Sequence, residues 1–186
     1  MRIFLSIPVP NVVKNIKQML TSTFENERAE IRWVKHNNLH LTVQWLGSAS
    51  DEKVPKIIKE VEKVVSTINS FVLTVSKTGC FPNTSKPSVL YLGVRGNIEA
   101  LKALVVKIND KMSQVGFKKD SESFIPHITV AKINYPQKFN PDLSIFLNST
   151  YDEVEFLVDK IQLLESKTFT EGVVYKTLNT FSFLEK

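Results

Sequence analysis

The strongest constraint on the fold of this chain is a four-residue motif that occurs twice. Residues 40–43 read His-Leu-Thr-Val, and residues 127–130 read His-Ile-Thr-Val. Because alternate side chains of a β-strand share a face, each motif predicts a strand with histidine and threonine on one side. The branched apolar residues then lie on the other side. Two such strands, each with one buried face, can line a single cleft with two imidazoles.

The remaining sequence alternates between strand and helix patterns. Helices are predicted where apolar residues recur every three or four positions, over 10–24, 51–68 and 97–115. Strands are predicted over 2–9, 31–34, 40–46, 71–77, 88–95, 127–133, 154–164 and 173–183. A turn-rich loop is expected over 79–86, and a short helix over 143–147.

The order of these elements suggests an internal duplication. A strand, a long helix and a histidine strand occur in the first half and again in the second. This order predicts an α+β fold of two pseudo-symmetric lobes, each a mainly antiparallel sheet with a packed helix, enclosing a central cleft. Because no linker separates the halves, residues 1–186 are expected to form one bilobal domain.

Composition narrows the class of protein. The net charge of +5 suits an anionic ligand. With Cys80 as the one cysteine, an intrachain disulfide is excluded, and a free thiol is favoured over a nucleophile. The first residues show no signal-peptide pattern, and no stretch has the length of a membrane span. A cytoplasmic protein without a membrane partner is therefore expected.

Two imidazoles in one cleft favour acid–base chemistry at phosphorus. One histidine can take a proton from an attacking water while the other protonates the departing oxygen. The threonine hydroxyl groups can donate hydrogen bonds to phosphate oxygens. A bi-histidine metal site is the competing interpretation, but no Asp, Glu or Cys accompanies either motif. The third histidine, His36, lies in a polar turn and is expected to be exposed.

The sequence around the motifs resembles the two-histidine phosphoesterase superfamily and, within it, the RNA 2′,3′-cyclic phosphodiesterases, also called the 2′-5′ RNA ligase family. The matching segments occur in order from residue 2 to about residue 183. They are 32–34, 40–47, 79–82, 89–94, 124–131 and 164–175.

This resemblance implies an activity and a site. Family members open a 2′,3′-cyclic phosphate at an RNA end to a 2′-phosphate, and some also join 2′,5′ ends in the reverse direction. By analogy, His40 is the proton donor and His127 the proton acceptor, while Thr42 and Thr129 bind the phosphate. The residues alone leave open which histidine is the acid. The resemblance implies no metal and no cofactor, and a monomer is expected.

Three further residues are candidates for substrate binding. Lys132 follows the second motif where the family commonly has arginine, but strand alternation turns it away from His127 unless the strand bulges there. A solvated lysine is the alternative. Phe81 could stack on a base or close one end of the core. Tyr175 lies near the cleft by the same resemblance.

Strand alternation and composition give weaker expectations for other residues. Trp33 and Trp45 are expected in the core, because alternation places Trp45 opposite His40. Gln44 shares the His40 face by the same rule, and could line the cleft or reach solvent. The pair at 118–119 (Lys-Lys) is expected to be a solvated loop rather than an RNA contact.

Two other functions remain open at this point. One is a non-catalytic module that binds RNA ends in the same cleft; the intact histidine and threonine pairs argue against it. The other keeps the chemistry but acts on a small cyclic nucleotide or an ADP-ribose cyclic phosphate. A comparison of rates on RNA ends and on mononucleotides must decide between these substrates.

Overall fold

The computed structural model of the chain describes residues 1–120 and 123–185. Its elements, in chain order, are β1 (Arg2–Pro8), α1 (Val12–Thr21), η1 (Ser22–Phe24), β2 (Arg32–Trp33), η2 (His36–Asn38), β3 (His40–Ser48), η3 (Asp51–Lys53), α2 (Val54–Val65), β4 (Phe71–Phe81), β5 (Val89–Gly96), α3 (Ile98–Gln114), β6 (His127–Lys132), α4 (Ser144–Asn148), β7 (Val154–Val158), β8 (Lys160–Phe169) and β9 (Gly172–Ser182).

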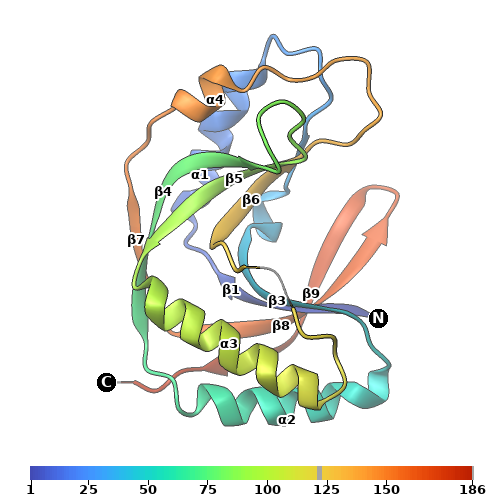
Figure 1. Cartoon of the computed structure of the whole chain (residues 1–186), viewed down its shortest axis with the longest axis vertical. Helices are drawn as coiled ribbons and strands as arrows, with labels where there is room; N and C mark the ends of the chain where they lie inside the picture. Colours follow the sequence, from blue (N-terminus) through green and yellow to red (C-terminus); the bar gives the residue numbers. More distant parts are fainter. Residues whose placement is uncertain (121–122, 186) are drawn as a thin grey trace.

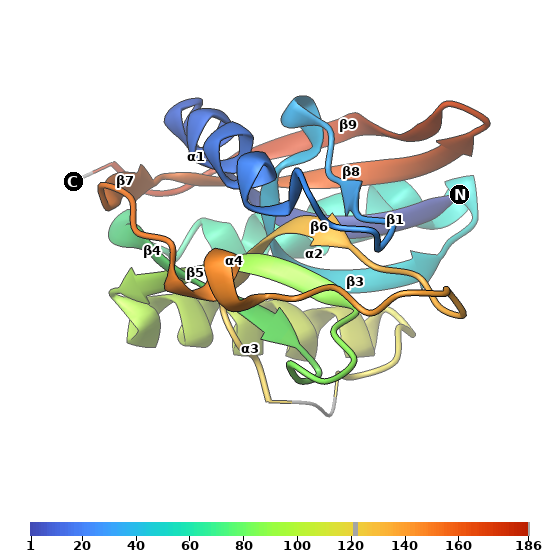
Figure 2. The same ribbon diagram turned by 90° about the horizontal axis from the view of Figure 1, so that it is seen from above.

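The strands form one curled antiparallel sheet with two halves. Among the described residues, the strand order is β7-β4-β5-β6-β3-β1-β8-β9, and the short β2 pairs with β6. The halves β7-β4-β5-β6 and β3-β1-β8-β9 meet where β3 pairs with β6 through Leu41 and Ile128 (Figures 1 and 2). The α+β class and the two lobes around a central site are therefore confirmed.

The long helices cover the outside of the curled sheet. α2 and α3 pack side by side, with α2 against β9 and α3 against β3, while α4 packs against β4 (Figure 1). α3, which comes from the second half of the chain, therefore packs on a strand from the first half of the chain. The helix stripes are fully buried against the sheet; their residues include Ile57, Val61, Leu101, Leu104 and Ile108. This burial provides most of the helices' stability.

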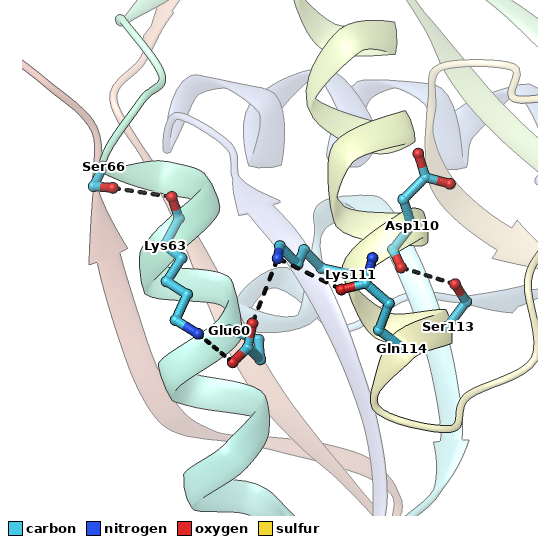
Figure 3. A network of polar contacts seen from close by, with 7 residues as sticks. All are labelled: Glu60, Lys63, Ser66, Asp110, Lys111, Ser113 and Gln114. Atoms are coloured by element: carbon cyan, nitrogen blue, oxygen red, sulfur yellow. Dashed lines mark hydrogen bonds and ion pairs between the residues drawn. The ribbon is translucent and has the colours of Figure 1, made fainter.

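Polar side chains connect α2 and α3 along their exposed edge. Lys63 donates a hydrogen bond of 2.6 Å to Glu60 in α2, and Lys111 of α3 approaches the other oxygen of that carboxylate at 3.7 Å (Figure 3). The hydrogen bond from Lys63 is the main cause of the lowered pKa of Glu60. Because the contacts are solvated, they orient the helices more than they stabilise them.

Two element boundaries differ from the sequence expectations. β4 continues to Phe81, through the start of the predicted loop at 79–86. The predicted strand 154–164 is two strands, because the chain leaves the sheet at Asp159; β7 pairs with β4 and β8 with β1. The Asp159 carbonyl accepts a hydrogen bond from the Phe183 amide instead. Both segments are rich in β-forming residues, so no local pattern marks the break.

No helix in the described part of the chain combines the length and the apolar character needed to cross a membrane.

Candidate active site

The two motif strands meet at the centre of the sheet. β3 and β6 pair through Leu41 and Ile128, the apolar residue between histidine and threonine in each motif. Continuing this antiparallel register by one residue in each direction places the histidine of each motif level with the threonine of the other. Leu41 and Ile128 are fully buried on the outer side. The two histidines and two threonines therefore share the inner face.

A β-bulge follows the threonine in both motifs. The register between β3 and β1 shifts by one residue at Val43, and the register between β6 and β5 shifts by one residue at Val130. A bulge reverses the alternation of side chains beyond it. The residue five positions after each histidine therefore returns to the inner face. These residues are Trp45 in β3 and Lys132 in β6.

The bulges correct three expectations from strand alternation. Lys132 faces away from His127 in a regular strand, and the bulge turns it to the same face. The placement of Trp45 in the core is wrong: the side chain lies on the inner face and is 47% exposed. Gln44 turns to the outer face, where it is buried and donates a hydrogen bond to Asn109 of α3.

His40 is held by its own strand and by two aromatic rings. Its Nδ1 lies 2.7 Å from the Asn38 carbonyl oxygen, and its Nε2 lies 3.1 Å from Oγ1 of Thr42. The ring centroid is 4.9 Å from that of Phe4 and 5.3 Å from that of Tyr175. Because a carbonyl oxygen only accepts hydrogen bonds, Nδ1 carries a proton. Nε2 is therefore the nitrogen that gains or loses a proton.

His127 has a matching environment in the other half. Its Nδ1 lies 2.7 Å from the Ile125 carbonyl oxygen, again two residues earlier in the chain. Its ring meets Phe81 edge-on at a centroid distance of 5.0 Å and Tyr91 at 5.5 Å. Phe81 and Tyr91 stack on each other at 4.4 Å. Each histidine thus has a fixed tautomer and two aromatic neighbours.

The structure brings the predicted candidates Phe81 and Tyr175 beside the histidines, one in each half. Sequence reasoning missed Phe4 and Tyr91, which complete the aromatic pairs. Both lie on the strand that pairs with a motif strand within its own half. An alternating strand pattern does not say which face is the inner one, so no local signal identified these residues.

The environment of His40 favours its neutral form. Burial lowers the pKa of His40 below its ordinary value, and the Asn38 carbonyl acts in the opposite direction. The positive charges of Lys132 and His127 lower the pKa of His40 further. Burial also raises the pKa of Tyr175, so this hydroxyl group stays protonated. The inner face therefore carries a cation beside a readily deprotonated imidazole.

Two pockets flank the histidine pair. A small pocket of about 220 Å³ adjoins His40 and Tyr175. A larger pocket of about 470 Å³ adjoins His127. We call the second one the Trp45 pocket; its lining residues are Thr42, Val43, Gln44, Trp45, Phe81, Pro82, Asp120, Ser123, Phe124, Ile125 and His127. Of the two, only the Trp45 pocket falls within the range of volumes that is usual for small-molecule sites.

The other candidates have no contact with the rings of His40 or His127 among the aromatic and hydrogen-bond contacts of the described residues. Cys80 is half-buried and burial raises the pKa of its thiol, which disfavours a nucleophile. His36 is exposed, as expected, although it also lines the small pocket that adjoins His40. Lys119 forms an ion pair of 2.6 Å with Asp110, and Lys118 is exposed. Within residues 1–120 and 123–185, no three His, Cys, Asp or Glu side chains gather into a group that could hold a metal ion.

Comparison with known proteins identifies relatives of this chain. The model of the 2′-5′ RNA ligase superfamily matches residues 8–168. A protein of Thermotoga maritima named RNA 2′,3′-cyclic phosphodiesterase is 29% identical over 184 residues, covering 98% of this chain and 96% of its own. A protein of Methanocaldococcus jannaschii with the same name is 28% identical over 182 residues, covering 96% of this chain and 98% of its own.

Solved structures share the fold. A protein of Thermus thermophilus superposes with a TM-score of 0.80 at 22% identity, covering 98% of both chains. Escherichia coli LigT complexed with 3′-AMP superposes with a TM-score of 0.79 at 22% identity, covering 98% of this chain and 97% of its own. At this level of identity, the likeness concerns the fold.

Proposed function

Since this chain belongs to the 2′-5′ RNA ligase superfamily, we propose that it hydrolyses 2′,3′-cyclic phosphate ends of RNA to 2′-phosphate ends, without a metal ion. One observation carries the proposal. The His-x-Thr strands pair through Leu41 and Ile128, and each histidine has Nδ1 tied to a carbonyl oxygen. Two imidazoles are thereby set to exchange protons through Nε2 on one face. The names of the full-length relatives support this substrate.

In the proposed reaction, His127 is the proton acceptor and His40 the proton donor. Nε2 of His127 takes a proton from water, and the water oxygen attacks phosphorus as the bond from phosphorus to O3′ breaks. Nε2 of His40 gives its proton to O3′. The product keeps the phosphate on O2′. Proton exchange with solvent then returns both histidines to their starting states.

The environment of His40 is consistent with the role of donor. Burial and the Lys132 charge lower the pKa of His40, which makes the protonated imidazole a stronger acid. A bound cyclic phosphate brings one negative charge into the same cleft, and this charge favours the protonated form before the reaction. His40 therefore acquires its proton with the substrate and releases it readily to O3′.

The remaining candidates would bind and orient the substrate. The hydroxyl groups of Thr42 and Thr129 donate hydrogen bonds to the non-bridging phosphate oxygens, and Lys132 neutralises their charge. Phe81 and Tyr175 flank the histidines and limit the positions open to ribose and base. Because the steps are reversible, a 5′-hydroxyl group in place of water would give 2′-5′ ligation.

The test is hydrolysis of an oligoribonucleotide ending in a 2′,3′-cyclic phosphate, with EDTA present. We expect a 2′-phosphate product from the wild-type protein. His40→Ala and His127→Ala should each lose at least about 100-fold in kcat while keeping the wild-type circular dichroism spectrum. Lys59→Ala is the control and should keep most of the activity, because Lys59 is exposed on α2 and lines neither pocket beside the histidines.

Other outcomes point to the other functions. RNA binding without turnover would indicate a non-catalytic module that recognises RNA ends. Turnover of a mononucleoside 2′,3′-cyclic phosphate, but not of the oligonucleotide, would indicate a small cyclic nucleotide as substrate. Wild-type activity in either histidine variant would refute the assignment of an acid–base pair.

A further inference from the structure

Trp45 and Gln44 occupy positions opposite to their hydrophobic preference. The bulge at Val43 leaves the Trp45 side chain 47% exposed and buries Gln44 to 4% exposure. Oε1 of Gln44 has no hydrogen-bond partner among the described residues, so its burial has a free-energy cost. Stability alone would favour the reverse arrangement. The arrangement leaves the indole available on the inner face for contact with a ligand.

Two aromatic residues that line the Trp45 pocket, Trp45 and Phe81, are each held by a further ring outside its lining. Phe4 stacks on the indole at a centroid distance of 5.2 Å, and the Arg2 guanidinium lies 5.8 Å from it. Both come from β1, and neither is a lining residue of the pocket. Phe81, which also lines the pocket, stacks on Tyr91.

Aromatic residues held in this way suit a planar base. A base stacked on an aromatic side chain is bound with little dependence on its sequence, because every base has a π-face. The side chain of Phe124 adds a third apolar surface to the same pocket. The pocket therefore has the chemistry of a nucleoside site, and His127 and Thr42 are among its lining residues.

The pocket lies on one defined side of the reaction. Because β3 and β6 are antiparallel, Trp45 lies beyond the His127 end of their pairing and Lys132 beyond the His40 end. Trp45 and His127 line the same pocket, and the charge of Lys132 acts on His40. Under the proposed function, O3′ and the RNA that carries the cyclic phosphate lie on the His40 side.

We infer that the Trp45 pocket is a second nucleoside site, which binds the nucleoside whose 5′-hydroxyl group reacts at phosphorus. This inference rests on the proposed function and on its assignment of His127 as the base. In ligation, the bond from O5′ to phosphorus forms and the bond from phosphorus to O3′ breaks. The O5′ proton goes to His127, and His40 supplies a proton to O3′. The reverse steps cleave a 2′,5′-linkage, with the nucleoside leaving from the Trp45 pocket.

Binding can be tested without catalysis. Trp33→Phe leaves Trp45 as the only tryptophan, and adenosine, which has no phosphate, is the probe. We expect saturable quenching of Trp45 fluorescence that persists when 2′-AMP saturates the phosphate site. Trp45→Phe, which retains only Trp33, is the control and should show no quenching. Absence of quenching, or competition between adenosine and 2′-AMP, would overturn the inference.

The same experiment separates this inference from the proposed function. Quenching by adenosine together with a failure of 2′-AMP to bind would support a nucleoside pocket and refute the proposed phosphate site. Binding of 2′-AMP without any response to adenosine would do the reverse. The two ligands therefore report independently on the two sites.

A kinetic comparison tests the assignment to the reacting nucleoside. The substrates are a 2′,5′-linked diadenosine monophosphate and an oligonucleotide 2′,3′-cyclic phosphate, which water opens. Loss of one stacked base corresponds to about 5- to 150-fold in kcat/KM. We expect Trp45→Ala to lower kcat/KM for the diadenosine substrate about 10-fold more than for the cyclic phosphate, and Trp45→Phe to restore most of the difference.

The kinetic result has two outcomes that would overturn the inference. An equal loss on both substrates would place the terminal nucleoside of the cyclic phosphate in the pocket instead. Failure of an active wild-type protein to cleave the 2′,5′-linkage at all would remove the need for a second nucleoside. Thermal denaturation of Trp45→Ala checks that the variant is folded at the assay temperature.

Discussion

Gly79 leaves no space for a side chain, and this makes it a sharp probe of the His127 environment. A Cβ at this position would lie 2.6 Å from Cε2 of Tyr91, and closer still to Cζ and the hydroxyl oxygen. Ordinary contacts begin at about 3.4 Å. Gly79→Ala therefore requires the Tyr91 ring to move by at least ~0.8 Å.

The Tyr91 ring cannot make this movement alone. It stacks on Phe81 at 4.4 Å and contacts the His127 ring at a centroid distance of 5.5 Å. Overpacking of this kind lowers the free energy of unfolding by about 1–3 kcal/mol. A displacement near 1 Å of a catalytic group lowers rates by up to about 100-fold. We expect Gly79→Ala to reduce kcat by about 10- to 100-fold through the position of His127.

A double-mutant cycle supplies the control. Gly79→Ala, Tyr91→Ala and the double variant are compared by urea unfolding and by hydrolysis of the cyclic phosphate oligonucleotide. In the Tyr91→Ala background the new methyl group has no ring to displace, so Gly79→Ala should then have little effect on either quantity. An equal loss in both backgrounds, or no loss in the wild-type background, would refute this account of Gly79.

Three other predictions concern α3 and His40. Asn97→Ala removes the side-chain oxygen that accepts a hydrogen bond from the Ala100 amide at the start of α3, and should lower the free energy of unfolding by about 1 kcal/mol without changing kcat; a change in kcat alone would contradict this. Lys132→Gln should raise the pKa of His40 in an NMR titration, because the Lys132 charge lowers it. Because folding lowers the pKa of His40 from 6.5, the unfolded chain binds this proton at a higher pH than the folded chain does, and the wild-type protein loses stability as the pH falls below about 6.5. His40→Gln lacks the titrating group, so its free energy of unfolding should fall less steeply over the same pH range. A steeper fall in that variant would show that the sign is wrong.

Much of the fold and the central part of the site follow from local sequence patterns. The apolar stripes of the long helices identify α2 and α3 because helices bury one face at a fixed period. The repeated His-x-Thr motif identifies β3 and β6 because strands alternate with a period of two. These patterns also give the inner face of His40 and His127. They are reliable where one regular element runs without interruption.

Local patterns do not indicate where that regularity fails. A bulge depends on how two strands pair, and the residues at Val43 and Val130 are ordinary strand formers. For this reason, the sequence does not predict that the side chains of Trp45 and Lys132 lie on the inner face of the sheet. The break at Asp159 has a similar cause, because strand-forming residues lie on both sides and the break depends on pairing with distant strands.

The two bulges have different energetic explanations, although they occupy equivalent positions. Without the bulge at Val130, Lys132 would point to the outer, buried side, where an unpaired ammonium group is strongly unfavourable. The charge of Lys132 thus favours this bulge in any case. At Val43, stability favours a regular strand instead. Burying the exposed 47% of Trp45 would stabilise the fold by roughly 2 kcal/mol, and the Gln44 side chain would no longer be buried. Stability therefore does not account for the bulge at Val43. Its effect is to place an aromatic ring at the His127 end of the site and leave the charge at the His40 end, which gives a nearly symmetric cleft two chemically different sides.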